Sequence, residues 1–590
     1  MIAGGNAVAS ARVAATPREL GLSIGQHSDK GRKESNQDFH GALIPEQPAL
    51  GLKGIAIALA DGISSSSVSR FASESAIKGF LTDYYCTSDS WSVKTSAQRV
   101  IAATNSWLHA QTRRGEHPHD RDKGYVCTLS VMVVKSTVAH LFHVGDSRIY
   151  RVAGSALEQL TNDHRIVVSS QESYLGRALG ANPQIEIDYR AVPIEVGDVF
   201  VMATDGVYEH VTAPFVTKTI VQHAEDLDRA ARAIVAEAYA RGSPDNLTVQ
   251  IVRIDALPDA GTDAIGQAAE LPLPPLLQPR MVFEGYRILR ELHGSSRSHI
   301  YLAADTATEE LVALKIPSID LRDNPAYLKR LMMEEWIARR ITSAHVLATP
   351  ASSRPRNYLY AVTEFVEGTT LAQWMIDNAR PDLETVRGIV EQIAKGLRAF
   401  HRREMVHQDL RPQNVMIDKA GTVRIIDFGS TKVPGVIEAS PEIDGTDILG
   451  TAQYTAPEYF LGEGGSERSD LFSLGVIAYQ MLTGKLPYGA EVARAATKAR
   501  QQRLAYISAR ASNPDIPAWV DGALRRATHP DPHKRYEALS EFIYDLRHPR
   551  EEFLRETPVP LLERNPVRFW QLLSLLLGTT TLVLLFRLLQ

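Results

Sequence analysis

The segment HQDLRPQN, at positions 407 to 414, decides the fold of the second half of this chain. It places Asp409 and Asn414 five positions apart on one short stretch. In phosphoryl transfer, such an aspartate can accept the proton of the attacking hydroxyl, and such an asparagine can bind magnesium. Thirteen positions later, the apolar run VRII leads into DFG, which supplies a second carboxylate, Asp427. The order and spacing therefore predict a magnesium-dependent site for phosphoryl transfer.

A lysine upstream of this segment completes the pattern. The run VALK, at 312 to 315, ends a predicted strand with Lys315, whose ammonium can hold the α- and β-phosphates of a nucleotide. Such a lysine needs a carboxylate partner from a helix. Glu334 is the first choice for that partner and Glu335 is the alternative.

These motifs together resemble the eukaryotic-type Ser/Thr protein kinase family over about residues 286 to 548. Two later segments extend the resemblance, GTAQYTAPE at 450 to 458 and SDLFSLGV at 469 to 476. Arg411 stands where Ser/Thr kinases usually carry lysine and still offers a cation to phosphate. The resemblance implies a bilobal α+β fold with ATP and magnesium as cofactors, the metal being held by Asn414 and Asp427.

The same resemblance assigns further roles by position. It implies the gatekeeper Thr363, an adenine-binding hinge from Glu364 to Val366, Thr455 beside the catalytic aspartate, Asp470 supporting the catalytic loop, and a Glu458 to Arg535 pair.

Two departures from the kinase pattern affect the expected function. The phosphate-covering loop, LHGSSRSHIYLA at 292 to 303, keeps only Gly294, and Ser296 and Ser298 stand at the other glycine positions. Serine has less backbone freedom close to phosphates, so we expect modest ATP affinity. Gln408 replaces the arginine that normally reads activation-loop phosphate, so we do not expect activation by loop phosphorylation.

In the first half of the chain, aspartates follow or interrupt strand-like apolar runs such as GIAIALADG and VFVMATDG. Aspartates at the ends of adjacent buried strands converge, and clustered carboxylates are tolerable only around a hard cation. The aspartates in this pattern are Asp38, Asp61, Asp146, Asp205 and Asp245. The pattern predicts a metal centre in an α+β fold.

In order, these segments resemble the metal-dependent protein phosphatases of the type 2C class over about residues 22 to 254, through GDSR with the following IYR, LTNDH, RALG and PDNLTV. The resemblance implies a β-sandwich flanked by helices and a two-metal centre of magnesium or manganese. Asp61 would bridge the two ions, Asp205 and Asp245 would complete the coordination of one ion, and the Gly62 carbonyl would bind the other. Asp38 would support these ligands without binding an ion directly. The metal pair would activate a water for in-line attack on phosphoserine or phosphothreonine.

The phosphatase-like half also departs from its family. Lys33 or Arg32 is expected to hold the substrate phosphate, but Gln37 stands where a metal-binding glutamate is usual, and Ile63-Ser64-Ser65 replaces a glycine-rich continuation. A neutral amide binds a divalent ion less strongly than a carboxylate, so we expect a high metal requirement. The histidines His40, His143 and His164 are interpreted as structural.

The whole chain has 590 residues, a formal charge of −5 and only two cysteines, Cys86 and Cys127. These values fit a multidomain protein in a reducing compartment and give no reason to expect nucleic-acid binding. We predict six segments: a flexible tail at 1–20, a phosphatase 2C-like domain at 21–255, a Pro/Ala/Gly-rich linker at 256–282, a kinase domain at 283–548, a juxtamembrane segment at 549–567 and a transmembrane helix at 568–589.

The predicted transmembrane helix rests on FWQLLSLLLGTTTLVLLF, at 569 to 586, which carries no charge and meets the lower length limit for a span. Arg564 and Arg568 precede it and only Arg587 follows, so the positive-inside tendency would leave both domains in the cytoplasm. We expect a single-pass anchor in the cell membrane. The alternative is an amphipathic or buried helix that packs on the kinase domain.

The sequence favours a membrane-tethered bifunctional enzyme whose two domains oppose one another on protein Ser/Thr sites, with this chain itself among the candidate substrates. The alternative is an anchored sensor or scaffold in which one domain binds without turnover. A narrower hypothesis is that the phosphatase domain acts in cis on the kinase.

Overall fold

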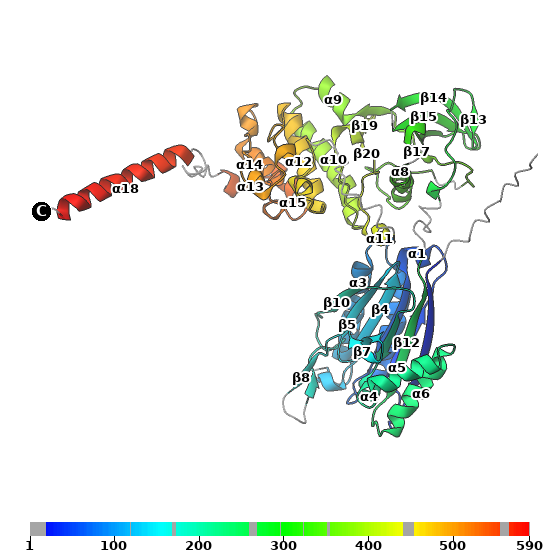
Figure 1. Cartoon of the computed structure of the whole chain (residues 1–590). Helices are drawn as coiled ribbons and strands as arrows, with labels where there is room; N and C mark the ends of the chain where they lie inside the picture. Colours follow the sequence, from blue (N-terminus) through cyan, green and yellow to red (C-terminus); the bar gives the residue numbers. More distant parts are fainter. Residues whose placement is uncertain are drawn as a thin grey trace, which may run out of the picture. The chain divides into compact units, whose positions relative to one another are not determined.

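The computed structural model describes residues 19–118, 120–167, 173–258, 268–295, 297–321, 324–350, 354–439, 453–554 and 566–588 (Figure 1). The chain forms two compact units. The first contains residues 1–368, 396–409 and 416–449, and the second contains 369–395, 410–415 and 450–590. The first unit therefore holds the whole phosphatase-like half together with the sheet of the kinase-like half.

The phosphatase-like half is a sandwich of two antiparallel five-stranded sheets, as predicted (Figure 1). One sheet has the order β1 (Gly21–Asp29), β12 (Leu247–Ala256), β11 (Val199–Ala203), β6 (Arg148–Ala153) and β7 (Ala156–Gln159). The other has the order β10 (Asp188–Pro193), β5 (Val138–Val144), β4 (Leu129–Lys135), β3 (Ile55–Ala60) and β2 (Phe39–Leu43). A separate ribbon pairs β8 (Arg165–Val167) with β9 (Ser173–Leu175).

Strand β3 shows how the sequence produces this layering. All six of its residues are buried. Because side chains alternate along a strand, Ile55, Ile57 and Leu59 pack with the apolar residues between the sheets, and the intervening alanines face two helices. These helices are α2 (Ser69–Cys86) and α3 (Val93–Arg114). Alanine on that face leaves room for the helices to approach the sheet.

Helices α5 (Ala213–Gln222) and α6 (Leu227–Ala240) cover the other sheet through residues that include Ile220 and Ile234. Helix α6 begins after Asp226, which caps it by accepting the Arg229 N–H at 2.9 Å. Two short helices complete this half, α1 (Ala49–Lys53) and α4 (Asp205–Tyr208), with a 3-10 turn at Arg121–Lys123.

The kinase-like half begins with an antiparallel sheet of β13 (Val282–Phe283), β14 (Tyr286–Gly294), β15 (Ser298–Asp305), β16 (Leu311–Pro317) and β17 (Ala361–Glu364), joined by helix α8 (Pro325–Ala338). Short strands β18 (Gly368–Thr370), β19 (Val415–Asp418) and β20 (Val423–Ile425) follow in sequence. A sheet lobe thus precedes a helical lobe along the chain, which agrees with the predicted bilobal α+β fold.

The helical part is built around α12 (Glu467–Thr483), in which nearly every residue is buried. Its other helices are α9 (Leu371–Asp377), α10 (Leu383–His401), α11 (Pro434–Ile437), α13 (Lys498–Gln501), α14 (Ala518–Ala527), α15 (Leu539–Arg547) and α16 (Glu551–Leu554). Single 3-10 turns lie at Ile319–Leu321, Pro412–Asn414, Pro457–Leu461, Val492–Arg494, Ala509–Ala511 and Pro532–Lys534.

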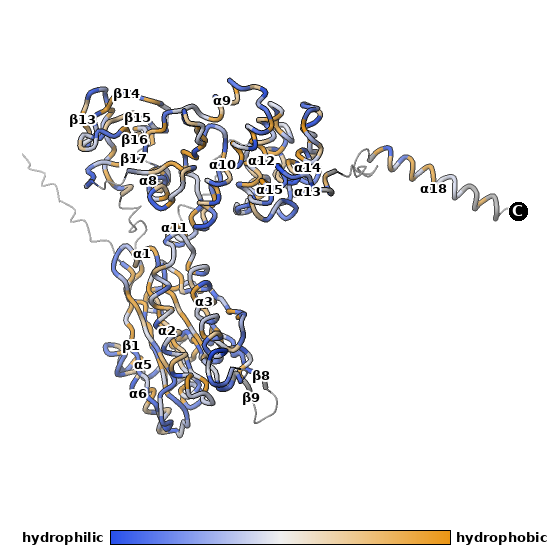
Figure 2. The backbone as a smooth tube through the Cα atoms, turned by 180° about the vertical axis from the view of Figure 1, so that it is seen from behind, coloured by the Kyte–Doolittle hydropathy of each residue, from blue (hydrophilic) through white to orange (hydrophobic). Residues whose placement is uncertain are grey.

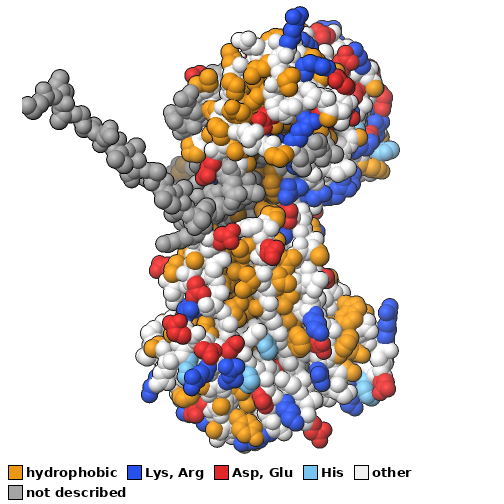
Figure 3. Space-filling view, turned by 90° about the vertical axis from the view of Figure 1, so that its right-hand side faces the viewer, with side chains coloured by type: hydrophobic (Ala, Val, Ile, Leu, Met, Phe, Trp, Pro, Cys, Tyr) orange, Lys and Arg blue, Asp and Glu red, His pale blue; other side chains and the backbone are white. Residues whose placement is uncertain are grey.

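On the face of the chain shown in Figure 3, basic and acidic side chains are interspersed.

The C-terminal helix α18 (Pro566–Leu588) covers the predicted span, and apolar residues recur along it (Figure 2). Its hydroxyls bond to preceding carbonyls, for example Thr580 Oγ1 to Leu576 O at 2.8 Å. Among the described residues, however, no helix is long and apolar enough to cross a membrane. The structure therefore does not support the predicted single-pass span, and Gln571, Ser574 and the threonines interrupt the apolar surface of α18.

Candidate active sites

The predicted metal-binding aspartates lie at strand ends of both sheets of the sandwich. Asp38 precedes β2, Asp61 follows β3, Asp146 lies between β5 and β6, Asp205 begins α4 after β11, and Asp245 precedes β12. Asp61 is close enough to Asp38, Asp205 and Asp146 to interact with each of them. The sheets therefore bring together carboxylates that are far apart in sequence.

Burial and mutual repulsion make three of the aspartates, Asp38, Asp61 and Asp205, hard to ionise. Burial raises the pKa of Asp38 to about 6, although Thr248 Oγ1 donates to it at 2.7 Å and Thr204 Oγ1 at 3.0 Å. Burial, with the charges of Asp146 and Asp245, raises the pKa of Asp205 to about 7. The pKa of Asp61 is raised well above its ordinary value by burial first and by its carboxylate neighbours second.

The donor chemistry of this cluster fits a divalent cation. Among the residues that the structure describes, no group donates a hydrogen bond to the buried Asp38 Oδ1. Hard carboxylate oxygens are the ligands that magnesium and manganese prefer. As arranged, though, no three His, Cys, Asp or Glu side chains within the described ranges form a ready metal cage. Part of the reason is that two cationic side chains already pair with carboxylates of the cluster. Lys33 pairs with Asp245 at 3.3 Å, and Arg165 pairs with Asp146 and Asp205.

Arg165 is a site residue that the sequence did not reveal. Its guanidinium donates from Nε to Asp146 at 2.6 Å, from Nη2 to Asp205 at 2.9 Å and from Nη1 to Glu209 at 2.8 Å. The only sequence signal was its place directly after the LTNDH segment. Arg165 therefore neutralises part of the charge that the aspartates place at this end of the sandwich.

Replacing Arg165 with alanine is expected to destabilise the metal-free protein by about 2 kcal/mol, because three carboxylates lose a charged hydrogen-bond donor. Manganese should restore more stability to this variant than to the wild type, since the ion then neutralises charge that Arg165 no longer neutralises. Thermal unfolding in EDTA and in excess manganese measures both effects. Arg151→Ala, which removes a guanidinium paired with Asp198 at 2.8 Å, is the matched control. An equal manganese effect in Arg165→Ala and wild type would contradict this role.

The remaining phosphatase-side predictions have different outcomes. Lys33 lies at the cluster, donating to Ser64 Oγ at 2.8 Å as well as pairing with Asp245. Arg32 does not reach it, because its guanidinium donates to the Ser243 and Tyr239 carbonyls, both at 3.3 Å. Phosphate binding by Lys33 or Arg32 stays a prediction.

Gly62 and Gln37 pack tightly beside the aspartates. A Cβ on Gly62 would lie 2.8 Å from the Ser69 carbonyl and 2.9 Å from the Gln37 carbonyl, so only glycine fits there. The Gln37 amide nitrogen donates to the Ser66 carbonyl at 2.8 Å and to Ser69 Oγ at 2.7 Å. The Gln37 amide group is thereby fixed to the loop that leads into α2.

The three histidines have structural environments. Burial lowers the pKa of His143 to about 4, and its ring bonds to Ser130 Oγ at 2.9 Å. His164 lies 3.1 Å from both the Gly145 nitrogen and Asp188 Oδ2. Burial also lowers the pKa of His40.

On the kinase side, Lys315 of β16 pairs with Glu334 of α8, with Nζ 2.6 and 2.8 Å from the two carboxylate oxygens. Burial alone would lower the pKa of Lys315, but the carboxylates of Asp427 and Glu334 raise it well above its ordinary value. Lys315 is therefore a permanent cation. The alternative partner, Glu335, pairs instead with Arg339 at 2.7 Å and with Arg356.

The DFG segment lies against this ion pair. A Cβ on Gly429 would come within 2.7 Å of Glu334 Oε1, so glycine permits the close approach. The Gly429 N–H donates to Asp427 Oδ1 at 3.1 Å, which fixes the aspartate at the turn. The first unit thus gathers Lys315, Glu334 and Asp427, the charges that a nucleotide phosphate and its metal require.

The catalytic segment is divided between the two units. In the first unit, the Asp409 N–H donates to the His407 carbonyl at 2.9 Å, and Gln408 has a positive φ of 67°. In the second unit, Asn414 is buried and its Oδ1 accepts from Arg411 Nε at 3.3 Å.

The second unit also contains the predicted ion pair of Glu458 and Arg535. Two hydrogen bonds join the side chains, at 2.8 and 2.7 Å, and both residues are buried. Thr455 and Asp470 of this unit are buried as well.

At the predicted phosphate-covering loop, the Glu291 side chain fills the space beside Gly294. A Cβ on Gly294 would lie 2.6 Å from Glu291 Oε1, and Ser298 is buried in β15, whereas Ser296 lies outside the described residues. At the predicted hinge, Glu364 accepts the Ala348 N–H at 3.0 Å and pairs with Arg424 at 2.9 Å. Val366 is buried and Thr363 is partly buried.

Comparison with known proteins finds one family model that matches each half of the chain. The protein phosphatase 2C family matches residues 26–242, and the protein kinase domain family matches residues 286–543. These ranges fall inside the predicted domains at 21–255 and 283–548, whose limits stay predictions.

Curated relatives of the chain include bacterial Ser/Thr protein kinases. "Serine/threonine-protein kinase PrkC" of Bacillus subtilis is 28% identical over 262 residues, which cover 44% of this chain and 40% of the relative. "Serine/threonine-protein kinases PknA" of Corynebacterium glutamicum is 34% identical over 211 residues, which cover 34% of this chain and 44% of the relative. The chain thus spans less than half the length of these curated relatives.

Solved structures resemble each half separately. The serine/threonine phosphatase PstP/Ppp of Mycobacterium tuberculosis covers 40% of this chain and 99% of its own, with 22% identity and a TM-score of 0.34. The PknI kinase domain of the same organism covers 46% of this chain and 98% of its own, with 24% identity and a TM-score of 0.37.

Proposed function

We propose that this chain, which joins a protein phosphatase 2C domain to a protein kinase domain, is a bifunctional enzyme of reversible protein phosphorylation. Its kinase domain transfers the γ-phosphate of ATP to serine and threonine hydroxyls of proteins, and its phosphatase domain hydrolyses the resulting esters. The observation that carries the proposal is the presence of two charge arrangements in one chain. One is Lys315 with Glu334 and Asp427, and the other is the buried carboxylate cluster around Asp61.

In the kinase reaction, Asp409 accepts the proton of the substrate hydroxyl. The hydroxyl oxygen bonds to the γ-phosphorus of ATP, and the bond between that phosphorus and ADP breaks. Lys315 holds the α- and β-phosphates, and Glu334 keeps its ammonium in position. Asn414 and Asp427 would hold magnesium, which neutralises phosphate charge when bound. The hinge from Glu364 to Val366 would bind adenine, and Gly294 would approach the phosphates.

In the phosphatase reaction, a water oxygen attacks phosphorus in line with the departing serine or threonine oxygen, which leaves with a proton. Magnesium or manganese, when bound, supplies the acidified water and screens phosphate charge. The residues that would hold these ions are Asp61, Asp205, Asp245, Asp146, the Gly62 carbonyl and, from behind, Asp38. Lys33, at the cluster edge, would bind the substrate phosphate.

The proposal is tested by assaying the purified full-length chain for both activities in one buffer with ATP, magnesium and manganese. Transfer of labelled phosphate to a protein substrate, and release of phosphate from a phosphothreonine peptide, should both be measurable. The matched variants Asp409→Ala and Asp205→Ala should each abolish one activity and retain the other.

The alternative function, a scaffold or sensor with one non-catalytic domain, is favoured by Gln37, whose amide is tied to Ser66 and Ser69 beside the cluster. A domain of this kind would bind its metal or nucleotide without turnover. Isothermal titration with manganese, combined with the phosphatase assay, separates the two functions. Binding without phosphate release at any metal concentration would favour the scaffold.

The substrates of both domains are proposed to be proteins phosphorylated on serine or threonine, including this chain itself. If the phosphatase domain acts in cis, Asp205→Ala should raise the level of autophosphorylation over that of the wild type. Equal levels, read by phosphate-affinity electrophoresis, would argue against the cis reaction.

A membrane role for α18 is a further part of the proposal. Its support is limited to the exposed apolar side chains of the helix, among them Leu572, Leu575 and Leu576, which are 57%, 69% and 61% exposed. With both enzymatic domains in the cytoplasm, the full-length chain should then sediment with cell membranes, and a chain lacking residues 566 to 590 should not. Recovery of both proteins in the soluble fraction would contradict membrane attachment.

A further inference from the structure

Glu438 joins the two domains within the first unit. It directly follows α11, eleven residues after Asp427 of the DFG segment. Its carboxylate lies 3.2 Å from Lys135 Nζ, at the end of β4 in the phosphatase domain. The same carboxylate accepts the Val93 N–H, at the start of α3, at 3.2 and 2.9 Å. One acidic side chain of the kinase domain is therefore bound by two elements of the phosphatase domain.

The burial of Lys135 distinguishes this contact from an ordinary surface ion pair. Its side chain is only 1% exposed, and its ammonium also donates to the Gly435 carbonyl at 2.6 Å. A buried ammonium is costly unless it is paired and hydrogen-bonded, and here both partners come from α11 and its end. Without the kinase segment, Lys135 would lose both of these partners.

The backbones also meet closely at this contact. The Gly435 N–H donates to the Ser90 carbonyl at 3.0 Å, and Ser90 Oγ donates to the Arg403 carbonyl at 2.6 Å. A Cβ on Gly435 would lie 2.5 Å from the Asp89 carbonyl and 2.7 Å from that of Trp91. The phosphatase loop before α3 therefore fits α11 at atomic contact distance.

This loop is fixed from within the phosphatase domain. Lys53 Nζ donates to Thr87 Oγ1 at 2.8 Å, to the Ser88 carbonyl at 2.7 Å and to Ser96 Oγ at 3.1 Å. The loop is thus held in shape by groups that do not belong to the kinase domain. A rigid surface of this kind can order a segment that packs on it.

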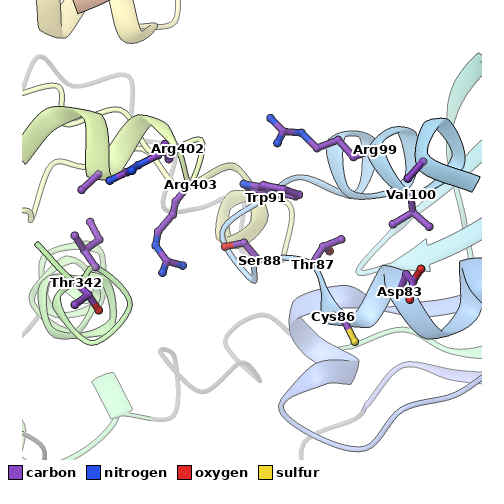
Figure 4. Close-up of a pocket in the computed structure, with 13 residues that line it drawn as sticks. Asp83, Cys86, Thr87, Ser88, Trp91, Arg99, Val100, Thr342, Arg402 and Arg403 are labelled. Carbon is purple, nitrogen blue, oxygen red and sulfur yellow. The ribbon is translucent and has the colours of Figure 1, made fainter. Parts of the chain in front are cut away.

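A pocket of about 690 Å³ lies at the edge of the contact (Figure 4). Trp91, Arg99 and Cys86 line it from the phosphatase domain, and Arg402 and Arg403 from the kinase domain. The Arg340 guanidinium, from the kinase domain, pairs with Asp89 at 3.1 Å. The contact is therefore buried at Lys135 and open to solvent at this edge.

The segment bound in this way is the start of the kinase activation segment. Six residues before Glu438, Lys432 pairs with Val406, its N–H donating at 2.8 Å and its carbonyl accepting at 3.1 Å. Val406 in turn lies three residues before Asp409. The contact at Glu438 is thus linked through a short run of backbone to both Asp427 and Asp409.

We propose that the phosphatase domain holds the start of the activation segment in its ordered position through Glu438 and Gly435. In kinases that carry arginine at the position of Gln408, that arginine binds the activation-loop phosphate and orders the segment. In this chain, the contact with the phosphatase domain takes over that ordering role. The Lys315 to Glu334 pair is formed while the contact is in place, so the contact supports the aligned state of the kinase. The catalytic consequence rests on the proposed kinase function, whereas the ordering itself does not.

The test uses the full-length chain with Glu438→Ala and Gly435→Ala, the latter placing a methyl group against phosphatase backbone. Hydrogen exchange of peptides covering 428 to 439 should be at least tenfold faster in both variants than in wild type. The kcat for phosphoryl transfer should fall at least tenfold with little change in the KM for ATP, and phosphatase activity should stay within twofold. Glu74→Ala, which removes a carboxylate paired with Lys78 on helix α2, is the control for loss of an acidic side chain.

A charge exchange provides the rescue experiment. Lys135→Glu should behave like Glu438→Ala, and the double variant Lys135→Glu with Glu438→Lys should recover slow exchange and part of the kcat. Unchanged exchange in Glu438→Ala, or a rise in kinase activity, would overturn the proposal. If the wild type transfers no phosphate, the proposed kinase function fails, and the exchange data still decide whether the contact orders the segment.

Discussion

Replacing Lys315 with methionine is expected to lower phosphoryl transfer from ATP by about 10²–10³-fold, the effect of removing one fixed charge from a developing phosphate transition state. Methionine keeps the length and apolar stem of lysine but removes the ammonium between Glu334 and Asp427. Because methionine has no titratable group, no pH within the stable range of the protein should restore activity to the variant. Steady-state transfer to a protein substrate measures the loss.

The control for this variant is Lys395→Met, which removes an exposed lysine that pairs with Glu391 at 3.0 Å on helix α10. It should retain wild-type transfer. Phosphatase activity should be unchanged in Lys315→Met, because Lys315 lies in the kinase sheet. Transfer by Lys315→Met within threefold of wild type would contradict the assigned role of this residue.

Replacing Asp61 with asparagine is expected to reduce phosphate release by about 10³-fold, since loss of a central metal ligand removes several kcal/mol of transition-state stabilisation. The same variant should be more stable than wild type in EDTA. Burial and neighbouring carboxylates raise the pKa of Asp61, so its ionised form costs stability as pH rises through that pKa, and a neutral amide avoids this cost. Thermal unfolding at pH 7.5 and a phosphopeptide assay measure the two effects.

This opposite movement of activity and stability separates a metal ligand from a structural residue, whose loss would lower both. Manganese should raise the unfolding temperature of wild type more than that of Asp61→Asn. Asp122→Asn, at an exposed turn of the same domain, is the control and should alter neither property. An active Asp61→Asn protein would remove Asp61 from the site.

Much of both sites could be predicted because their charged residues lie at or near the ends of apolar runs that form strands. Asp61 and Asp205 each come directly after or one residue beyond an apolar run, and antiparallel strands in two packed sheets bring such ends together. The partner of Lys315 could be narrowed to two adjacent glutamates but no further. Neighbouring helix positions point about 100° apart, so the rotation of α8 decides between Glu334 and Glu335.

Other features depend on contacts that no local pattern encodes. Arg165 reaches three acidic side chains from the short strand β8, and nothing in its immediate sequence marks it as their partner. The pair of Lys135 and Glu438 joins residues about 300 positions apart, and each by itself resembles an ordinary surface charge. Arg32 stacks on Tyr239, about 200 positions away in the sequence, and no local pattern encodes that contact either.

The measurement that tests the central claim most directly is quantitative phosphoproteomics of cells carrying wild type, Asp409→Ala or Asp205→Ala. If one chain both adds and removes phosphate at shared protein sites, serine and threonine sites that lose occupancy in Asp409→Ala should gain it in Asp205→Ala. Two unrelated sets of sites, or a set that responds to only one variant, would contradict the account of two opposed activities.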